Sequence, residues 1–123
     1  MSSIAALMEL LRVKKEQLRR LLTCQANLNQ SQSAFFANEY LCMEPKLTPG
    51  SWEGSLANEF DWLRESGILT NYREIETSQF NDVFRVLNDT IRRVELEIQL
   101  IEQQIAALQE AERKRAAEAS KLS

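Results

Sequence analysis

Apolar side chains in the second half of the chain recur at alternating spacings of four and three residues. The series is Phe80, Phe84, Leu87, Ile91, Val94, Ile98, Ile101, Ile105 and Leu108. This spacing places every member on one stripe of a helix and is the heptad seam of a coiled coil. Because no Gly or Pro interrupts the series, it predicts one long helix that packs its seam against another helix.

A second helix is predicted over residues 3–43, before the first proline. Its apolar seam positions are Leu7, Leu11, Leu18, Leu21, Leu28 and Phe35, and the intervening seam positions hold Lys14, Gln25 and Gln32. Polar residues in a seam lower stability but fix the register and the choice of partner. The stretch 25–33 is notably polar, which predicts that this half of the helix is the softer one.

The connection between the two helices is predicted at residues 44–51. Pro45 disfavours helical backbone at the residue before it and therefore ends the first helix. Pro49-Gly50 is a turn pair, and Ser51 suits the N-cap of a helix that starts at Trp52. A short connection makes the two helices antiparallel neighbours. The expected fold class is all-α, a single domain (1–123) formed by one long antiparallel helical hairpin.

The predicted second helix (52–117) is not uniform. Its early seam, Leu56, Phe60 and Leu63, is out of step with the seam that begins at Phe80, and Gly67 lies in the gap. Gly costs about 1 kcal/mol relative to Ala inside a helix, and a phase slip changes the supercoil locally. We therefore predict a kink or a short break within 66–72. Residues 113–123 have nothing apolar to bury before Leu122, so this tail is expected to fray.

The two helices have unequal predicted lengths, about 60 Å and nearly 100 Å at roughly 1.5 Å per residue. Pairing outward from the turn would exhaust the first helix near residues 90–95. The later part of the seam would then face a partner protein. Its members are Val94, Ile98, Ile101, Ile105 and Leu108. A fold-back at Gly67 is the alternative, because the remaining helix would then match the first one in length.

Charge narrows the classes of function. The net charge of −3 and the acidic segment 50–82, with seven acids against two Arg, argue against nucleic acid and anionic membranes as partners. Residues 1–23 are basic instead, with five Lys/Arg against two Glu. These basic residues are Arg12, Lys14, Lys15, Arg19 and Arg20. They form either a phosphate-binding patch or, as we favour, the solvated face of a helix.

The sequence offers no set of residues for catalysis, a metal or a cofactor. It has no His, and Cys24 and Cys42 would lie about 27 Å apart on one helix, too far for a disulfide. The many carboxylates have no cleft to desolvate them. We therefore expect no enzyme and no cofactor. Free cysteines and the lack of a signal peptide or an apolar run long enough to span a membrane favour a cytoplasmic protein.

At the predicted turn the sequence reads Trp52-Glu53-Gly54, and the segment from Trp52 to Phe60 is similar to the pattern W-x-G-x-x-A-x-x-F. This resembles the WXG100-like superfamily of type VII secretion, and most closely the YwqH-like small helical proteins associated with LXG toxins. The resemblance implies a non-enzymatic targeting factor or chaperone. Such a protein pairs with the helical N-terminal domain of an LXG toxin, together with a second small helical protein. It adds Trp52 and Gly54 to the candidate partner-binding residues.

One departure from the family concerns export. Relatives that engage the secretion ATPase carry a Y-x-x-x-D/E element just after the second helix. Here Tyr72 and Glu76 match that element but lie early in the second helix. The resemblance therefore implies that a partner completes the export signal, with the chain either retained in the cytoplasm or co-secreted. Two alternatives stay open: a self-associating coiled-coil scaffold or adaptor protein, and a WXG100-type protein that is secreted as its own dimer.

Overall fold

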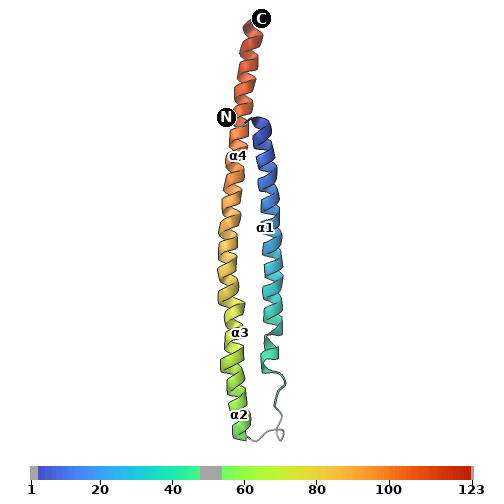
Figure 1. Ribbon diagram of the computed structural model, residues 1–123, viewed down its shortest axis with the longest axis vertical. Helices are drawn as coiled ribbons and strands as arrows, with labels where there is room; N and C mark the ends of the chain where they lie inside the picture. The colour runs from blue at the N-terminus through green and yellow to red at the C-terminus, as the bar shows by residue number, and fades with distance from the viewer. Residues whose placement is uncertain (1–2, 48–53, 123) are drawn as a thin grey trace. The chain divides into compact units, whose positions relative to one another are not determined.

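The computed structural model describes residues 3–47 and 54–122, and within these ranges every regular element is a helix (Figure 1). The elements are α1 (Ile4–Asn38), the 3-10 helix η1 (Glu39–Met43), α2 (Gly54–Leu63), the π-helical turn η2 (Arg64–Leu69), α3 (Thr70–Glu74), a second π-helical turn η3 (Ile75–Gln79) and α4 (Phe80–Leu122). The predicted all-α helical hairpin is confirmed. The predicted N-cap, Ser51, and the first two residues of the predicted second helix lie outside the described residues.

The helix ends differ from the prediction in two places. α1 ends at Asn38, and η1 takes the chain to Met43, where the first helix was expected to end. Glu44 is extended (φ −100°, ψ 147°), as expected of a residue before proline. α4 continues to Leu122 rather than to residue 117, because the Ala, Glu, Lys and Arg of the tail are all good helix formers. Every residue from 109 to 122 is exposed.

The second helix does not break at Gly67. Leu63 and Thr70, which flank η2, both keep helical dihedral angles (φ −62°, ψ −41° and φ −60°, ψ −45°). Of the predicted kink or short break, the break is not present, and the irregularity takes the form of the π-helical turn η2. A π-helical turn accommodates one extra residue within a continuous helix. The phase slip between the early and late seams is taken up in η2 and η3.

The chain forms two compact units. The first consists of Met1–Cys24 and Leu87–Ser123, and the second of Gln25–Val86. In the first unit, α1 and α4 pack antiparallel with the seam closed between them. Leu7, Ile101 and Ile105 form a buried cluster, and Ile4, Leu11 and Leu108 pack against it.

This packing overturns the prediction of an unpaired stripe. Val94 and Ile98 are only 4% and 8% exposed. The residues assigned to a partner are instead covered by the chain's own first helix. They are Val94, Ile98, Ile101, Ile105 and Leu108, of which Leu108 is the most open.

The register explains the error. In the second unit, Glu39 pairs with Arg73, and the Pro45 carbonyl accepts a hydrogen bond from Arg64. Six residue steps before the turn thus run beside nine after it. A 3-10 helix rises about 2.0 Å per residue and extended chain about 3.3 Å, against 1.5 Å for an α-helix. The non-helical connection therefore covers more of the second helix per residue, but the six steps against nine shift the register by only three residues. Most of the offset is already present where Pro45 meets Arg64, because a turn at 44–51 would place Pro45 opposite residue 50. α1 therefore pairs with later residues than a tight turn would allow.

The core of the second unit is aromatic. The ring of Phe35 stacks on Tyr72 with 5.0 Å between centroids and meets the edge of Phe80 at 5.3 Å. The Tyr72 hydroxyl donates a 2.7 Å hydrogen bond to the Phe35 carbonyl oxygen. These contacts fix the register of α1 against α3 and the start of α4 within this unit.

Candidate partner-binding surfaces

Polar residues in the α1 seam find partners on the opposite helix. In the first unit, the Lys14 ammonium forms an ion pair with Glu97. The hydrogen bond from Lys14 is the main reason that the pKa of Glu97 lies below its ordinary value. In the second unit, the Gln32 side chain donates a 2.7 Å hydrogen bond to the Glu76 carbonyl oxygen. These seam residues therefore serve pairing within the hairpin rather than an outside partner.

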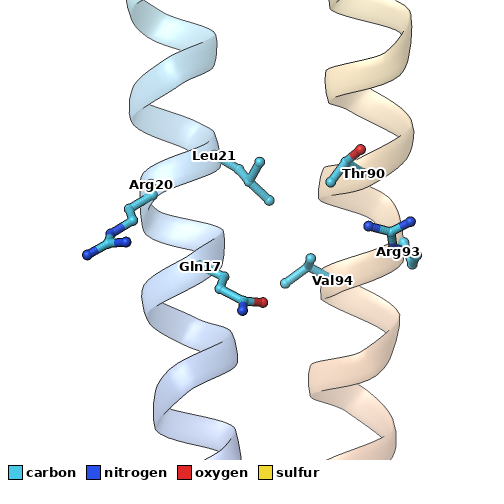
Figure 2. A pocket seen from close by; sticks show the side chains of 6 residues that line it. All are labelled: Gln17, Arg20, Leu21, Thr90, Arg93 and Val94. Carbon is cyan, nitrogen blue, oxygen red and sulfur yellow. The ribbon is translucent and has the colours of Figure 1, made fainter.

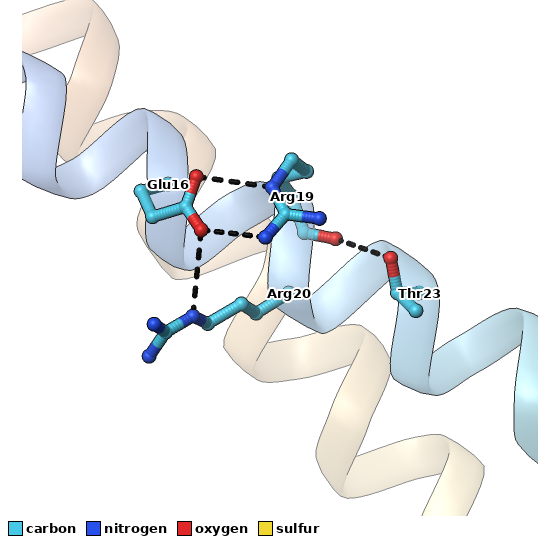
Figure 3. A network of polar contacts seen from close by, with 4 residues as sticks. All are labelled: Glu16, Arg19, Arg20 and Thr23. Atoms are coloured by element: carbon cyan, nitrogen blue, oxygen red, sulfur yellow. Dashed lines mark hydrogen bonds and ion pairs between the residues drawn. The ribbon is translucent and has the colours of Figure 1, made fainter.

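Three of the basic residues near the start of α1, Arg12, Arg19 and Arg20, pair with acids one turn away. Figure 3 shows the Glu16 carboxylate between Arg19, at 2.6 Å, and Arg20, at 3.5 Å. Arg12 likewise bonds to Glu9 at 2.7 Å. Hydrogen bonds from the arginines lower the pKa values of both Glu9 and Glu16. A phosphate would have to displace these carboxylates, which favours the solvated helix face over a phosphate-binding patch.

A groove of about 330 Å³ lies between α1 and α4 in the first unit. It is lined by Gln17, Arg20, Leu21, Thr90, Arg93 and Val94. Figure 2 shows the side chains of Leu21 and Val94 directed toward one another across the gap. The side chains of Arg20 and Arg93 are 76% and 70% exposed. The groove offers an apolar floor for a side chain, but no titratable pair held away from water of the kind that acid–base catalysis needs.

The structure describes only one of the two predicted site residues at the turn. Trp52 lies outside the described residues. Gly54 is the first residue of α2, and a side chain at this position would meet nothing within 4 Å. Among the described residues, none therefore approaches Gly54 closely enough to require a glycine there.

The apolar face of α2 points away from the hairpin. Leu56, Phe60 and Leu63 are 52%, 37% and 54% exposed. Each of them directly precedes a residue on the inward side, and these inward residues are Ala57, Asp61 and Arg64. An amphipathic helix at a protein surface normally turns its apolar side inward. We call Leu56, Phe60 and Leu63 the outward stripe.

Arg64 holds α2 in this orientation. It is only 5% exposed, and its guanidinium donates a 2.7 Å hydrogen bond to the Pro45 carbonyl oxygen and a 3.1 Å bond to Asp61. The guanidinium carbon also lies 4.6 Å from the centre of the Phe60 ring. These contacts offset part of the cost of burying the charge, and the Nε atom of Arg64 has no hydrogen-bond partner. The residue pattern does not predict this burial, because arginine is almost never fully buried unless it is paired.

A second buried polar group lies at η3. Glu76 is 2% exposed, and its Oε1 atom has no hydrogen-bond partner. Burial raises the pKa of Glu76, the nearby Glu39 raises it further, and Arg73 opposes both effects. Together with the Tyr72 hydroxyl bond to Phe35, this burial encloses both ends of the Y-x-x-x-E element within the hairpin.

The described part of the chain contains no cluster of three or more His, Cys, Asp or Glu side chains placed to hold a metal. Cys24 and Cys42 are both free. No helix within 3–47 or 54–122 has the length and apolar character needed to cross a membrane. In comparisons with known proteins, no protein family, curated sequence or solved structure matches the chain.

Proposed function

We propose that this protein is a non-enzymatic targeting factor or chaperone that pairs with the helical N-terminal domain of an LXG-type toxin for type VII secretion. The observation that carries the proposal is the outward stripe on α2. Leu56 and Leu63 are 52% and 54% exposed, while Arg64, a charged residue, occupies the inside. A helix from another protein would bury them, and full burial of a Leu or Phe side chain contributes about 1.5–3 kcal/mol.

A two-helix hairpin suits this role for a general reason. Two helices can cover only one stripe of each other, and in α1 only Leu7 becomes fully buried. Other seam leucines, among them Leu18, Leu21 and Leu28, remain partly open. A third helix that lies along the pair would complete this core as well.

The identity of the partner rests on the W-x-G resemblance, because the outward stripe directly follows that motif in the sequence. Both ends of the Y-x-x-x-E element are engaged inside the hairpin, which supports an arrangement in which the partner supplies the accessible export signal. The chain would then act in the cytoplasm and either stay there or leave with its toxin.

Co-expression with the product of the neighbouring large open reading frame tests the proposal. The expected result is a stoichiometric complex that is lost when Leu56→Asp and Leu63→Asp are combined. Leu96→Asp with Leu100→Asp is the matched control, since these α4 side chains are similarly exposed (54% and 59%). The proposal fails if the chain elutes alone and its neighbour is soluble without it.

A self-associating coiled-coil scaffold is the second candidate function. Leu96 and Leu100 favour it, because they are exposed and lie one turn apart on the same face of α4. Light scattering on the purified chain would then give a stable dimer or tetramer that Leu96→Asp with Leu100→Asp disperses. Substitutions at Ile98 and Ile101 cannot serve here, because both side chains are buried and their loss would unfold the hairpin.

A further inference from the structure

The two units differ in the kind of side chain that they bury. Among the described residues, every buried side chain of the first unit is apolar. These side chains are Leu7, Leu87, Ile91, Val94, Ile98, Ile101 and Ile105. The buried side chains of the second unit are Leu69 and two charged residues, Arg64 and Glu76. Regions with few buried apolar side chains open at a lower free energy than the rest of a protein, so we expect the second unit to open first.

Glu76 occupies the centre of the second unit. At 2% exposed, it is the most deeply buried side chain in the described part of the chain. It lies one helical turn from both Tyr72 and Phe80, whose rings contact Phe35 of α1. A carboxyl group therefore stands in a seam position between two aromatic residues, where α1 closes over it.

The hydrogen-bond donors near Glu76 are engaged elsewhere. The Gln32 amide bonds to the main-chain oxygen of Glu76 rather than to its carboxyl group, and the Tyr72 hydroxyl donates to a main-chain carbonyl of α1. Arg73 on α3 is paired with Glu39, which adds a second negative charge from η1. The Oε1 atom of Glu76 is consequently left without a partner.

This environment favours the neutral form of the carboxyl group. Burial of an ionised carboxylate without a partner costs far more free energy than burial of the protonated acid. The pKa of Glu76 is accordingly raised, first by burial and then by Glu39, while Arg73 opposes the shift. The closed unit therefore holds the proton more tightly than an open unit, in which Glu76 would have its ordinary pKa of 4.5.

We propose that Glu76 makes the second unit a pH-sensitive switch, which is closed while the carboxyl group is protonated and opens more readily once it is ionised. Opening would separate α3 and η3 from the second half of α1 and let water reach the carboxylate. It would also expose the rings of Phe35, Tyr72 and Phe80. The first unit would stay closed, because its buried side chains are all apolar. This inference concerns the chain alone and does not depend on the proposed partner.

Hydrogen exchange of the full chain, measured by mass spectrometry over a series of pH values, tests the switch. Protection is compared after correction for the intrinsic effect of pH on amide exchange. As the pH rises from 4.5 to neutral, protection should be lost in 25–38 and 70–80 and kept in 4–24 and 87–108. Constant protection in 70–80, or an equal loss in both units, would overturn the proposal.

Variants assign the effect to Glu76. Glu76→Gln cannot ionise, so it should keep the protection of 70–80 across the pH series. Glu76→Met removes both polar atoms and should also show no fall with pH, even if a buried amide weakens the glutamine variant at every pH. Glu74→Gln makes the same change at an exposed position two residues away and should behave as the natural chain does. If either Glu76 variant loses protection with pH as the natural chain does, the proposal is wrong.

Discussion

The side-chain amide of Gln32 donates a hydrogen bond to the main-chain carbonyl oxygen of Glu76 over 2.7 Å. In a regular α-helix that carbonyl would accept from the N–H of Phe80, but here this N–H donates to the carbonyls of Ile75 and Thr77. Gln32, a polar residue in the α1 seam, therefore bonds to the Glu76 carbonyl oxygen, which lacks its usual N–H donor because of the π-helical turn. The polar seam position and the irregular helix are two parts of one contact.

Replacement of Gln32 by methionine should destabilise the chain by about 1 kcal/mol, the net contribution of a typical hydrogen bond. Methionine keeps the length of the side chain and removes the donor. Urea denaturation followed by circular dichroism measures the change. Gln103→Met, on an exposed position of α4, is the control and should have little effect. A Gln32→Met chain as stable as the control would show that the hydrogen bond contributes nothing.

The stability of the second unit should depend on pH through Glu76. Its pKa in the folded chain lies above the ordinary 4.5, chiefly because of burial, so the folded chain binds this proton more tightly than the unfolded chain does. The stabilisation from protonation is therefore complete below about pH 4.5 and is lost as pH rises through the folded pKa. Glu76→Gln, which stays neutral, should be more stable than the natural chain at pH 7.

Denaturation at a series of pH values tests this dependence. The advantage of Glu76→Gln should shrink as the pH falls toward 4.5. The exposed Glu59→Gln serves as a control and should show no such trend. A constant difference between Glu76→Gln and the natural chain at all pH values would contradict the assignment.

Because the seam is buried inside the hairpin, truncation of one of its side chains should lower the stability of the fold rather than the affinity for a partner. Ile101→Ala removes a side chain that is 6% exposed in the cluster with Leu7, and it should cost about 2–4 kcal/mol. Leu100→Ala, at the neighbouring exposed position, should change stability by less than about 0.5 kcal/mol. Thermal unfolding compares the two. Similar small effects of both substitutions would mean that the seam is not closed by α1.

Arg64→Lys should loosen α2 selectively. Lysine has one charged nitrogen and cannot reproduce the forked contacts with Pro45 and Asp61. Hydrogen exchange measured by mass spectrometry should show faster exchange in 54–63 and little change in the first unit. Arg73→Lys replaces an arginine whose side chain is 60% exposed and is the comparison. If exchange in 54–63 is the same in both variants, Arg64 does not anchor α2.

The sequence was sufficient for the fold class because heptad spacing depends only on which positions are apolar. It also located the irregularity near Gly67, since the step between Leu63 and Phe80 does not fit the heptad spacing. It could not show that the irregularity is a π-helical turn rather than a break. A break and a π-helical turn both accommodate the same mismatch between the two seams. Which of them forms depends on backbone hydrogen bonds, which the residue types do not determine.

The predicted site failed for a geometric reason. Whether Val94 and Ile101 face a partner or α1 depends on how many residues of the connection lie beside the second helix. Most of this offset is already present where Pro45 meets Arg64, and the residues of the connection carry no periodic signal that would predict it. The outward stripe was missed for a related reason: Leu56, Phe60 and Leu63 were identified as a seam, but the side of the helix that faces the hairpin was assumed rather than derived.

The outward stripe is separated from burial by a single residue. Leu56, Phe60 and Leu63 each stand one place before an inward position, and one residue turns an α-helix by about 100°. Deletion of Gly67, whose removal would leave η2 one residue shorter, would advance α2 by that angle and bring the leucines inside in place of Arg64. The same composition would then give an ordinary closed hairpin. Deletion of one codon can thus convert this exposed surface into a core, so the spacing of this segment constrains the protein as well as the identity of its residues.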